Sequence, residues 1–254
     1  MKYDDLFTDF LIQAKSDPNI LGVILLGSRG KGFYKEHSDY DFQVIVREEV
    51  LEEYKDKIKE IDNQDFFDCS VLTLESFKNY AAWDTEFMWD RYTYANVKPL
   101  IDKTNGVLEQ IIVDKGGIPQ EHIKDFTAGT LDAYINSVYR SMKGLRDKNI
   151  IAYRLEAVDS INYLLQVLFA IHDGRLRPYN KYLKIELEKY PLKKLKWTSD
   201  EFLQMPMRII ETGDYKIQQK IMIEVQAIMQ KEGFGYVFDS WEGNEKWTMS
   251  FEPK

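Results

Sequence analysis

The strongest constraint on the fold is a change of sequence pattern at the glycine- and proline-containing residues 116–119 (GGIP). Before them, short apolar runs rich in branched residues, at 20–26 and 66–72, indicate buried strands. After them, apolar residues recur at helical spacing over 125–146 and 151–171, the second stripe including Leu155 and Val158. Because glycine and proline interrupt regular structure, 116–119 is the best candidate for a linker.

The expected fold class is therefore α+β. An N-terminal α/β domain with a mixed sheet, residues 1–116, is followed by an all-α helical bundle domain, residues 117–254. Further strand and helix patterns are predicted at 4–15 (helix), 39–47 (strand), 48–61 (helix), 97–112 (strand and turn), and 181–189, 199–211 and 214–231 (helices). The aromatic C-terminal tail is predicted to be irregular.

Composition excludes several classes of protein. With 44% hydrophobic and 30% charged residues, 254 residues can bury a sizeable core. The net charge of −8 lacks the basic excess of a general nucleic-acid binder, so no nucleic-acid partner is expected. The single cysteine excludes an internal disulfide, and three scattered histidines give no zinc spacing. No apolar run would span a bilayer, and the acidic N-terminal segment lacks a signal peptide's apolar core, so a cytoplasmic protein without membrane contact is expected.

Two familiar phosphate-binding motifs fail on the segment GSRGKGF. The Walker pattern requires glycine where Leu25 stands and serine or threonine where Gly32 stands. The dinucleotide fingerprint requires a third glycine where Lys35 stands. Phosphate binding through either motif is therefore excluded.

A different constellation carries chemistry. The strand at 20–26 ends at Gly27 and Ser28, and a flexible loop leads to Asp39 and Asp41, two residues apart on the next strand. Side chains two apart on a strand share a face, where two carboxylates repel each other and a hard divalent cation relieves the repulsion. Glycine at Gly27 allows backbone N–H groups to approach phosphate oxygens, and the Ser28 hydroxyl adds a donor.

A third carboxylate, Asp68, lies inside the apolar run FFDCSVL. An aspartate in a buried strand needs a reason, and Asp68 on a neighbouring strand would complete a site for two metal ions. Asp65 competes with Asp68 for this role. Cys69 alternates with Asp68 and should face the opposite side of the sheet, in the core.

The segment GSRGKGFYKEHSDYDFQVIV, followed by Asp68 on a third strand, resembles the signature of the polymerase-beta-like nucleotidyltransferase superfamily. The resemblance covers roughly residues 20–72. The helical half, including RPYNKYL, looks like the helical partner domain of bacterial small-molecule nucleotidyltransferases, among them adenylyltransferases that modify kanamycin- and lincosamide-type antibiotics.

The resemblance implies a metal-dependent enzyme that transfers a nucleoside monophosphate, AMP from ATP as the first expectation, to a hydroxyl of a small molecule. An aminoglycoside or lincosamide antibiotic is one acceptor class, consistent with a role in antibiotic resistance. Asp39, Asp41 and Asp68 would bind Mg²⁺, two ions being expected, and act in catalysis; Gly27 and Ser28 would bind the triphosphate of ATP or another nucleoside triphosphate. The helical domain would bind the substrate, and the protein would be a monomer or homodimer.

Other charged residues keep two interpretations. Arg140 and Lys143 share a helix face and either reach substrate phosphates from the helical domain or are surface charges. Glu156 is a candidate base for the acceptor hydroxyl or a partly exposed helix residue. In the loop after Ser28, Arg29, Lys31 and Lys35 are expected to be solvated, one of them touching the triphosphate. His172 is expected to cap helix carbonyls.

Two alternative functions stay open at the level of sequence. One is a protein-modifying nucleotidyltransferase of the toxin–antitoxin kind, which the large helical half disfavours. The other is a non-catalytic nucleotide-binding sensor, which the complete set of carboxylates disfavours.

Overall fold

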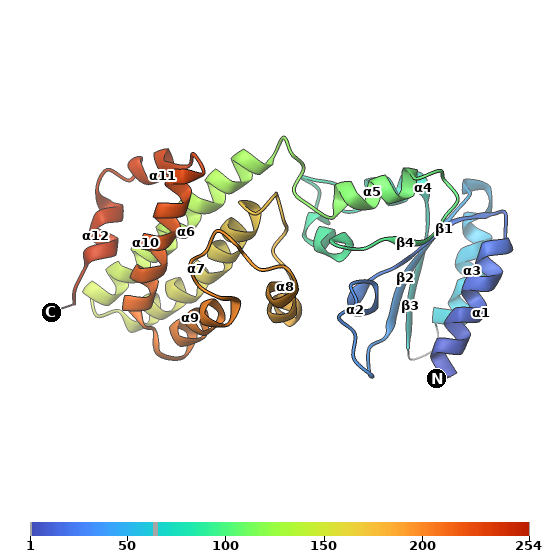
Figure 1. Ribbon diagram of the computed structural model, residues 1–254, viewed down its shortest axis with the longest axis horizontal. Coiled ribbons are helices and arrows are strands. Elements are labelled where there is room, and N and C mark those ends of the chain that lie inside the picture. Colours follow the sequence, from blue (N-terminus) through green and yellow to red (C-terminus); the bar gives the residue numbers. More distant parts are fainter. Residues whose placement is uncertain (1, 63–65, 254) are drawn as a thin grey trace. The chain divides into compact units, whose positions relative to one another are not determined.

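The computed structural model describes residues 2–62 and 66–253 of the chain, in which two compact units follow one another (Figure 1). The units are Met1–Pro119 and Gln120–Lys254. The expected boundary at 116/117 lies just before this division. The expected α+β class is confirmed, with a mixed sheet in the first unit and helices throughout the second.

The first unit is built on a four-stranded sheet in the order β3-β2-β1-β4. Its strands are β1 (Ile20–Leu25), β2 (Tyr40–Val46), β3 (Phe67–Thr73) and β4 (Pro99–Asp102). β1 is antiparallel to both β2 and β4, whereas β2 and β3 run parallel. The helical elements are α1 (Lys2–Ser16), α2 (Gly27–Gly30), η1 (Glu48–Val50), α3 (Leu51–Asp62), α4 (Leu74–Asn79), η2 (Met88–Tyr94) and α5 (Val107–Lys115).

Alternation along β2 divides the sheet into two apolar faces. Phe42 and Val44 join a core with Phe7 of α1 and Tyr54 of α3. Ile45 joins a second core, which α4, η2 and α5 build with the other face. Residues two apart on a strand lie on one face, so Asp41 and Gln43 lie on the Ile45 face.

The second unit is entirely helical in the part that the structure describes. Its elements are α6 (Ile123–Arg146), α7 (Ile150–Ala170), η3 (Asn180–Tyr182), α8 (Leu183–Lys189), α9 (Ser199–Thr212), α10 (Tyr215–Lys231), α11 (Gly235–Asp239) and α12 (Asn244–Ser250). One apolar cluster joins α6, α7, α9 and α10. No helix among residues 2–62 and 66–253 has the length and apolarity needed to cross a membrane.

Four expectations from the sequence are wrong in detail. The strand at 39–47 begins one residue later, so Asp39 precedes β2. Residues 107–112, the second part of the segment expected as strand and turn, lie in helix α5, and the tail forms α11 and α12. Leu155 and Val158 are exposed rather than buried, because the apolar pattern of α7 extends around more of the helix than its core contact covers.

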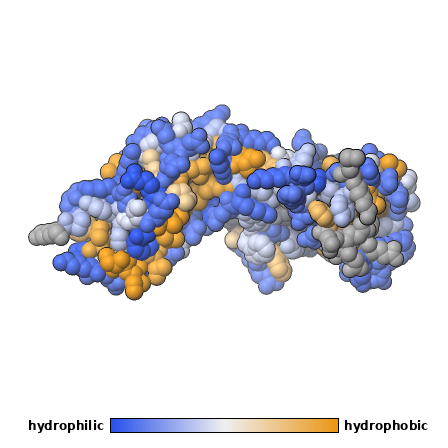
Figure 2. All heavy atoms as spheres, turned by 90° about the horizontal axis from the view of Figure 1, so that it is seen from below, coloured by the Kyte–Doolittle hydropathy of each residue, from blue (hydrophilic) through white to orange (hydrophobic). Residues whose placement is uncertain are grey.

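Exposed apolar side chains of the helical unit are visible in Figure 2.

The expectations for His172 and Cys69 are confirmed. Nδ1 of His172 contacts the Leu168 carbonyl oxygen at 2.6 Å, and Nε2 accepts the backbone N–H of Lys194 at 3.0 Å. Burial lowers the pKa of His172, which keeps the ring neutral and suited to this pair of contacts. Cys69 packs against the core on the sheet face opposite to Asp68.

Candidate active site

Asp41 and Asp68 lie side by side at the beginnings of two parallel strands. Their Cα atoms are register partners in the β2–β3 ladder, and the next pair on the same face is Gln43 and Ser70. Because side chains alternate along each strand and the register is continuous, Asp41 and Asp68 share the sheet face that α4 and α5 cover further along. The two carboxylates are therefore neighbours at the end of that face where its residues are polar rather than apolar.

The surroundings of Asp68 differ from the expectation. Asp68 is exposed rather than buried, because β3 is an edge strand of the sheet. Burial therefore does not single out Asp68, whereas its register with Asp41 does. Asp65, the competing candidate, lies outside the described residues.

Gly27 lies against the carboxylate of Asp41. The chain leaves β1 in a tight turn at α2, where Gly27 has φ +55° and a Cβ built on it would lie 1.8 Å from Asp41 Oδ2. The backbone N–H of Leu26 also donates to the Asp41 carbonyl oxygen at 2.7 Å. Glycine at 27 thus satisfies the left-handed backbone and leaves room for the Asp41 side chain.

Ser28 follows Gly27 and is partly exposed. Its backbone carbonyl accepts the N–H of Phe33 at 2.8 Å, which closes the turn. Within the part of the chain that the structure describes, no protein group is hydrogen-bonded to the Ser28 hydroxyl. That hydroxyl is therefore available to a ligand.

Arg29 holds the loop between α2 and β2, and sequence reasoning missed this role. Its Nε donates to the Ser38 carbonyl oxygen at 3.0 Å, and its Cζ lies 3.8 Å from the centroid of the Tyr40 ring. The Tyr40 hydroxyl donates to Asp4, and burial together with this bond raises the pKa of Tyr40 to about 12. The same bond lowers the pKa of Asp4. These contacts fix the backbone that leads into Asp39 and Asp41.

The expectation that the loop cations are solvated is wrong for Arg29, whose side chain is 17% exposed, and for Lys31. The Lys31 side chain is 4% exposed, and its ammonium group donates to the carbonyl oxygens of Tyr92, at 2.8 Å, and Ala95. It also lies 4.3 Å from the centroid of the Tyr92 ring. Lys31 ties the loop to η2, whereas Lys35 is exposed as expected.

The remaining acidic candidate, Asp39, is exposed immediately before β2. Among the described residues, no three or more His, Cys, Asp and Glu side chains are grouped so as to hold a metal ion. The carboxylates are thus neighbours along the sheet without forming a closed ligand group. Metal binding by Asp39, Asp41 and Asp68 stays a prediction.

The candidates on the helical unit do not form one cluster of cations. Arg140 is paired with Glu156, with Nη1 and Oε1 3.7 Å apart; the Arg140 side chain is exposed and that of Glu156 is partly exposed. The ammonium group of Lys143 lies 5.2 Å from the centroid of the Tyr139 ring. Phosphate binding by Arg140 and Lys143, and base catalysis by Glu156, stay predictions.

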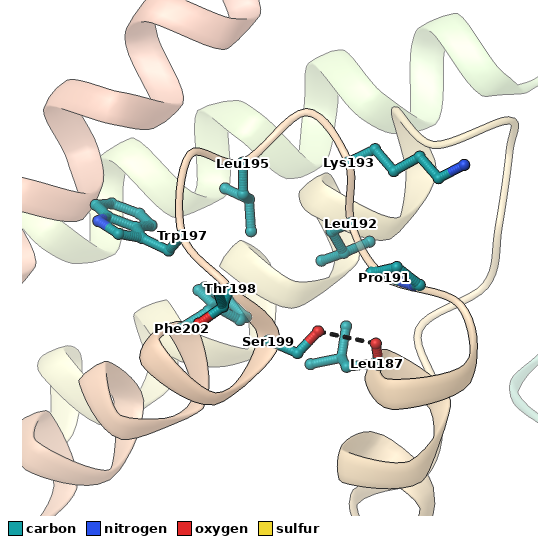
Figure 3. Close-up of a pocket in the computed structure, with 9 residues that line it drawn as sticks. All are labelled: Leu187, Pro191, Leu192, Lys193, Leu195, Trp197, Thr198, Ser199 and Phe202. Atoms are coloured by element: carbon teal, nitrogen blue, oxygen red, sulfur yellow. Dashed lines mark hydrogen bonds between the residues drawn. The ribbon is translucent and has the colours of Figure 1, made fainter.

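A cavity of about 110 Å³ lies within the helical unit (Figure 3). Its lining is mainly apolar, with Leu192, Trp197 and Phe202 around it, while the Ser199 hydroxyl donates to the Leu187 carbonyl oxygen at 2.8 Å. Ligand pockets usually measure about 300–1,000 Å³, so this cavity is too small for a nucleotide.

Comparison with known proteins is consistent with this geometry. Residues 10–89 match the family model described as a nucleotidyltransferase domain, and Asp39, Asp41 and Asp68 all lie in the matched segment. No curated protein matches the chain significantly. A solved nucleotidyltransferase-like protein from Exiguobacterium sibiricum is 8% identical, with a TM-score of 0.41, over 95% of this chain and 76% of that chain. A likeness that weak adds nothing to the family match.

Proposed function

We propose that this chain, whose residues 10–89 form a nucleotidyltransferase domain, transfers a nucleoside monophosphate to a hydroxyl of a small molecule. The single observation that carries the proposal is the pairing of Asp41 with Asp68 on adjacent parallel strands, beside the turn at Gly27 and Ser28. Transfer of a phosphorus-containing group requires charged groups positioned around the phosphate. Carboxylates next to a turn whose backbone can bind phosphate provide this arrangement.

The donor set suits a hard divalent cation. Asp39, Asp41 and Asp68 offer only carboxylate oxygens, the ligands that Mg²⁺ prefers, and Gly27 keeps the space beside Asp41 clear of a Cβ. These three residues would hold the metal, and two ions are part of the proposal. Bound Mg²⁺ would supply positive charge that offsets the negative charge of the phosphates and of the carboxylates.

The protein groups have separate tasks. Backbone N–H groups at Gly27 and the Ser28 hydroxyl bind triphosphate oxygens. A carboxylate oxygen of Asp68 accepts the proton of the acceptor hydroxyl, and the hydroxyl oxygen of the acceptor then attacks the α-phosphorus. The bond from the α-phosphorus to the bridging oxygen breaks, and pyrophosphate leaves with that electron pair.

For the substrates, we propose ATP as the donor and a small hydroxyl compound as the acceptor. The net charge of −8 favours a cationic acceptor such as an aminoglycoside, and a lincosamide is the second antibiotic class to test. The helical unit, Gln120–Lys254, is proposed to bind the acceptor.

The test is a screen of the full chain with radiolabelled nucleoside triphosphates, Mg²⁺ and pooled aminoglycosides, lincosamides and metabolites. We expect labelled acceptor and released pyrophosphate, both abolished by chelator and by Asp41→Asn. Glu52→Gln, which alters an exposed helix carboxylate, is the matched control and should retain activity.

Other results of the screen would contradict the proposal. Label on a co-purified protein would indicate a protein-modifying enzyme. Tight nucleotide binding without transfer to any acceptor would indicate a sensor. Nucleotide binding that is equally strong in chelator would exclude the metal site.

A further inference from the structure

Arg177 has an unusual environment in the helical unit. It lies between α7 and η3, directly before the buried Pro178, which disfavours helical backbone at Arg177. Its Nη2 donates to Oδ1 of Asn162 at 3.2 Å and to Oδ1 of Asn180 at 2.6 Å. Its Nε is buried without a hydrogen-bond acceptor among the described residues. The guanidinium is thus held in place by neutral amides.

Arg175, two residues earlier, is a structural arginine with a carboxylate partner, and it serves as a comparison for Arg177. Its Nη2 lies 3.1 Å from Oε1 of Glu186, a carboxylate that is 2% exposed. Its Nη1 donates to the Tyr190 carbonyl oxygen at 3.0 Å. Arg175 therefore has a buried counter-ion, whereas no ion pair to Arg177 is found in the part of the chain that the structure describes.

A half-buried cation without a counter-ion is unfavourable. Burial lowers the pKa of the Arg177 guanidinium, and no neighbouring charge opposes that effect. An oxyanion bound at this position would remove the cost of the uncompensated charge. With both Nη2 hydrogens donated to the asparagines and Nε buried, Nη1 is the nitrogen that remains to donate to a phosphate oxygen, and fixing the guanidinium beforehand reduces the entropy lost on binding.

We propose that Arg177, positioned by Asn162 and Asn180, binds a phosphate group of a polyphosphate. This inference rests on the proposed function, which supplies two such anions, the nucleoside triphosphate and the released pyrophosphate. It differs from the expectation for Arg140, whose charge is already matched by Glu156. Arg177 is a binding residue in this assignment, and the two asparagines are positioning residues.

The experiment is calorimetric titration of the full chain with magnesium pyrophosphate and with a non-hydrolysable α,β-methylene analogue of ATP. Arg177→Gln is expected to weaken binding by about 10- to 100-fold, the worth of one charge-assisted hydrogen bond. Arg177→Lys, which keeps the charge and loses the planar fork, should fall between. If Arg177→Gln weakens binding of pyrophosphate alone, the site binds the product. If it weakens binding of both anions, the site binds the triphosphate as well.

The matched control is Arg208→Gln, which removes an exposed arginine paired with Asp214 in the same unit and should leave both titrations unchanged. Thermal unfolding without ligand separates binding from structure. A structural Arg177 predicts a lower melting temperature for Arg177→Gln, whereas an anion-binding Arg177 predicts an unchanged or higher one, because the uncompensated charge is gone. Unchanged affinity for both anions, or a lower melting temperature that accounts for the weaker binding, would overturn the inference.

Failure of this inference can be told apart from failure of the proposed function. If the wild-type chain binds the ATP analogue with Mg²⁺ and Arg177→Gln binds it equally well, the inference is wrong and the proposed function stands. If the wild-type chain binds no triphosphate, the proposed function is wrong, and pyrophosphate binding that depends on Arg177 would still support the anion site.

Discussion

Gly27 and Asp41 are packed so closely that any side chain at position 27 would displace the carboxylate. A Cβ on Gly27 would lie 1.8 Å from Oδ2 and 2.8 Å from Cγ of Asp41. The glycine of the turn and the aspartate of β2 thus depend on one another, although they are separated by the loop that Arg29 fixes.

The first prediction concerns Gly27→Ala. The substitution places a Cβ at φ +55° and against Asp41, so we expect a loss of about 1–2 kcal/mol of unfolding free energy from the backbone alone. Metal-dependent binding of nucleoside triphosphate should fall further than in Ser28→Ala, because the Asp41 carboxylate has to move. Denaturant unfolding and calorimetry measure the two effects.

Gly106→Ala is the matched control for Gly27→Ala. Gly106 has φ +87°, and a Cβ at this position would have nothing within 4 Å, so the substitution carries the backbone cost without displacing a carboxylate. Equal nucleotide affinity in Gly27→Ala and Gly106→Ala would show that the close contact between Gly27 and Asp41 does not affect nucleotide binding.

The second prediction concerns Asp68→Asn. The amide has the shape of the carboxylate but does not accept a proton from the acceptor hydroxyl. We expect turnover to fall by about 10²–10⁴, the usual contribution of a general base, while triphosphate binding falls much less. Ser70→Ala, two register pairs further along β3 and on the same face of the sheet, should leave turnover nearly unchanged. Steady-state kinetics would count against Asp68 if Asp68→Asn and Ser70→Ala behaved alike.

The third prediction concerns Lys31→Met. Removing the ammonium leaves the carbonyl oxygens of Tyr92 and Ala95 without this donor, at a cost of about 1–3 kcal/mol for an unsatisfied buried group. Lys35→Met, at an exposed position of the same loop, should be close to neutral. Chemical denaturation of the two variants measures the difference, and equal stabilities would mean that Lys31 does not anchor the loop.

The fourth prediction concerns the pH dependence of stability at Lys115. Its side chain is 3% exposed and its ammonium donates to the Tyr80 carbonyl oxygen. Burial, with Arg91 nearby, lowers the pKa of Lys115 from 10.5 to about 8. Between pH 8 and 10 the unfolded chain therefore binds more protons at this residue than the folded chain does, so its contribution to stability rises with pH.

Comparison with Lys115→Met isolates this contribution. The difference in unfolding free energy between Lys115→Met and wild type should shift in favour of wild type between pH 7.5 and pH 9.5. The pKa of Tyr40 and that of Tyr80 are each about 12, so the contribution of these residues to the unfolding free energy falls only above pH 10, outside this range. A difference that stays constant with pH would show that Lys115 remains charged.

Much of the candidate site follows from the sequence because its signals are local. Strand patterns at 20–26 and 66–72, and two aspartates beside a glycine–serine turn, depend on residue types at short spacing. Such patterns correctly predict a mixed sheet followed by helices. They fail at 107–112 and in the aromatic tail, where burial against neighbouring elements stabilises helices of modest intrinsic preference.

By itself, the sequence determined the class of the chain, the strands that carry the carboxylates and the change to helix near residue 116. Only the tertiary structure decided that β2 and β3 are parallel with Asp41 opposite Asp68, that Lys31 is buried, and that Arg175 has a carboxylate partner while Arg177 has amides. The physical reason is that strand register, desolvation and counter-ions depend on groups far apart in the chain, which are brought together by packing rather than by local spacing.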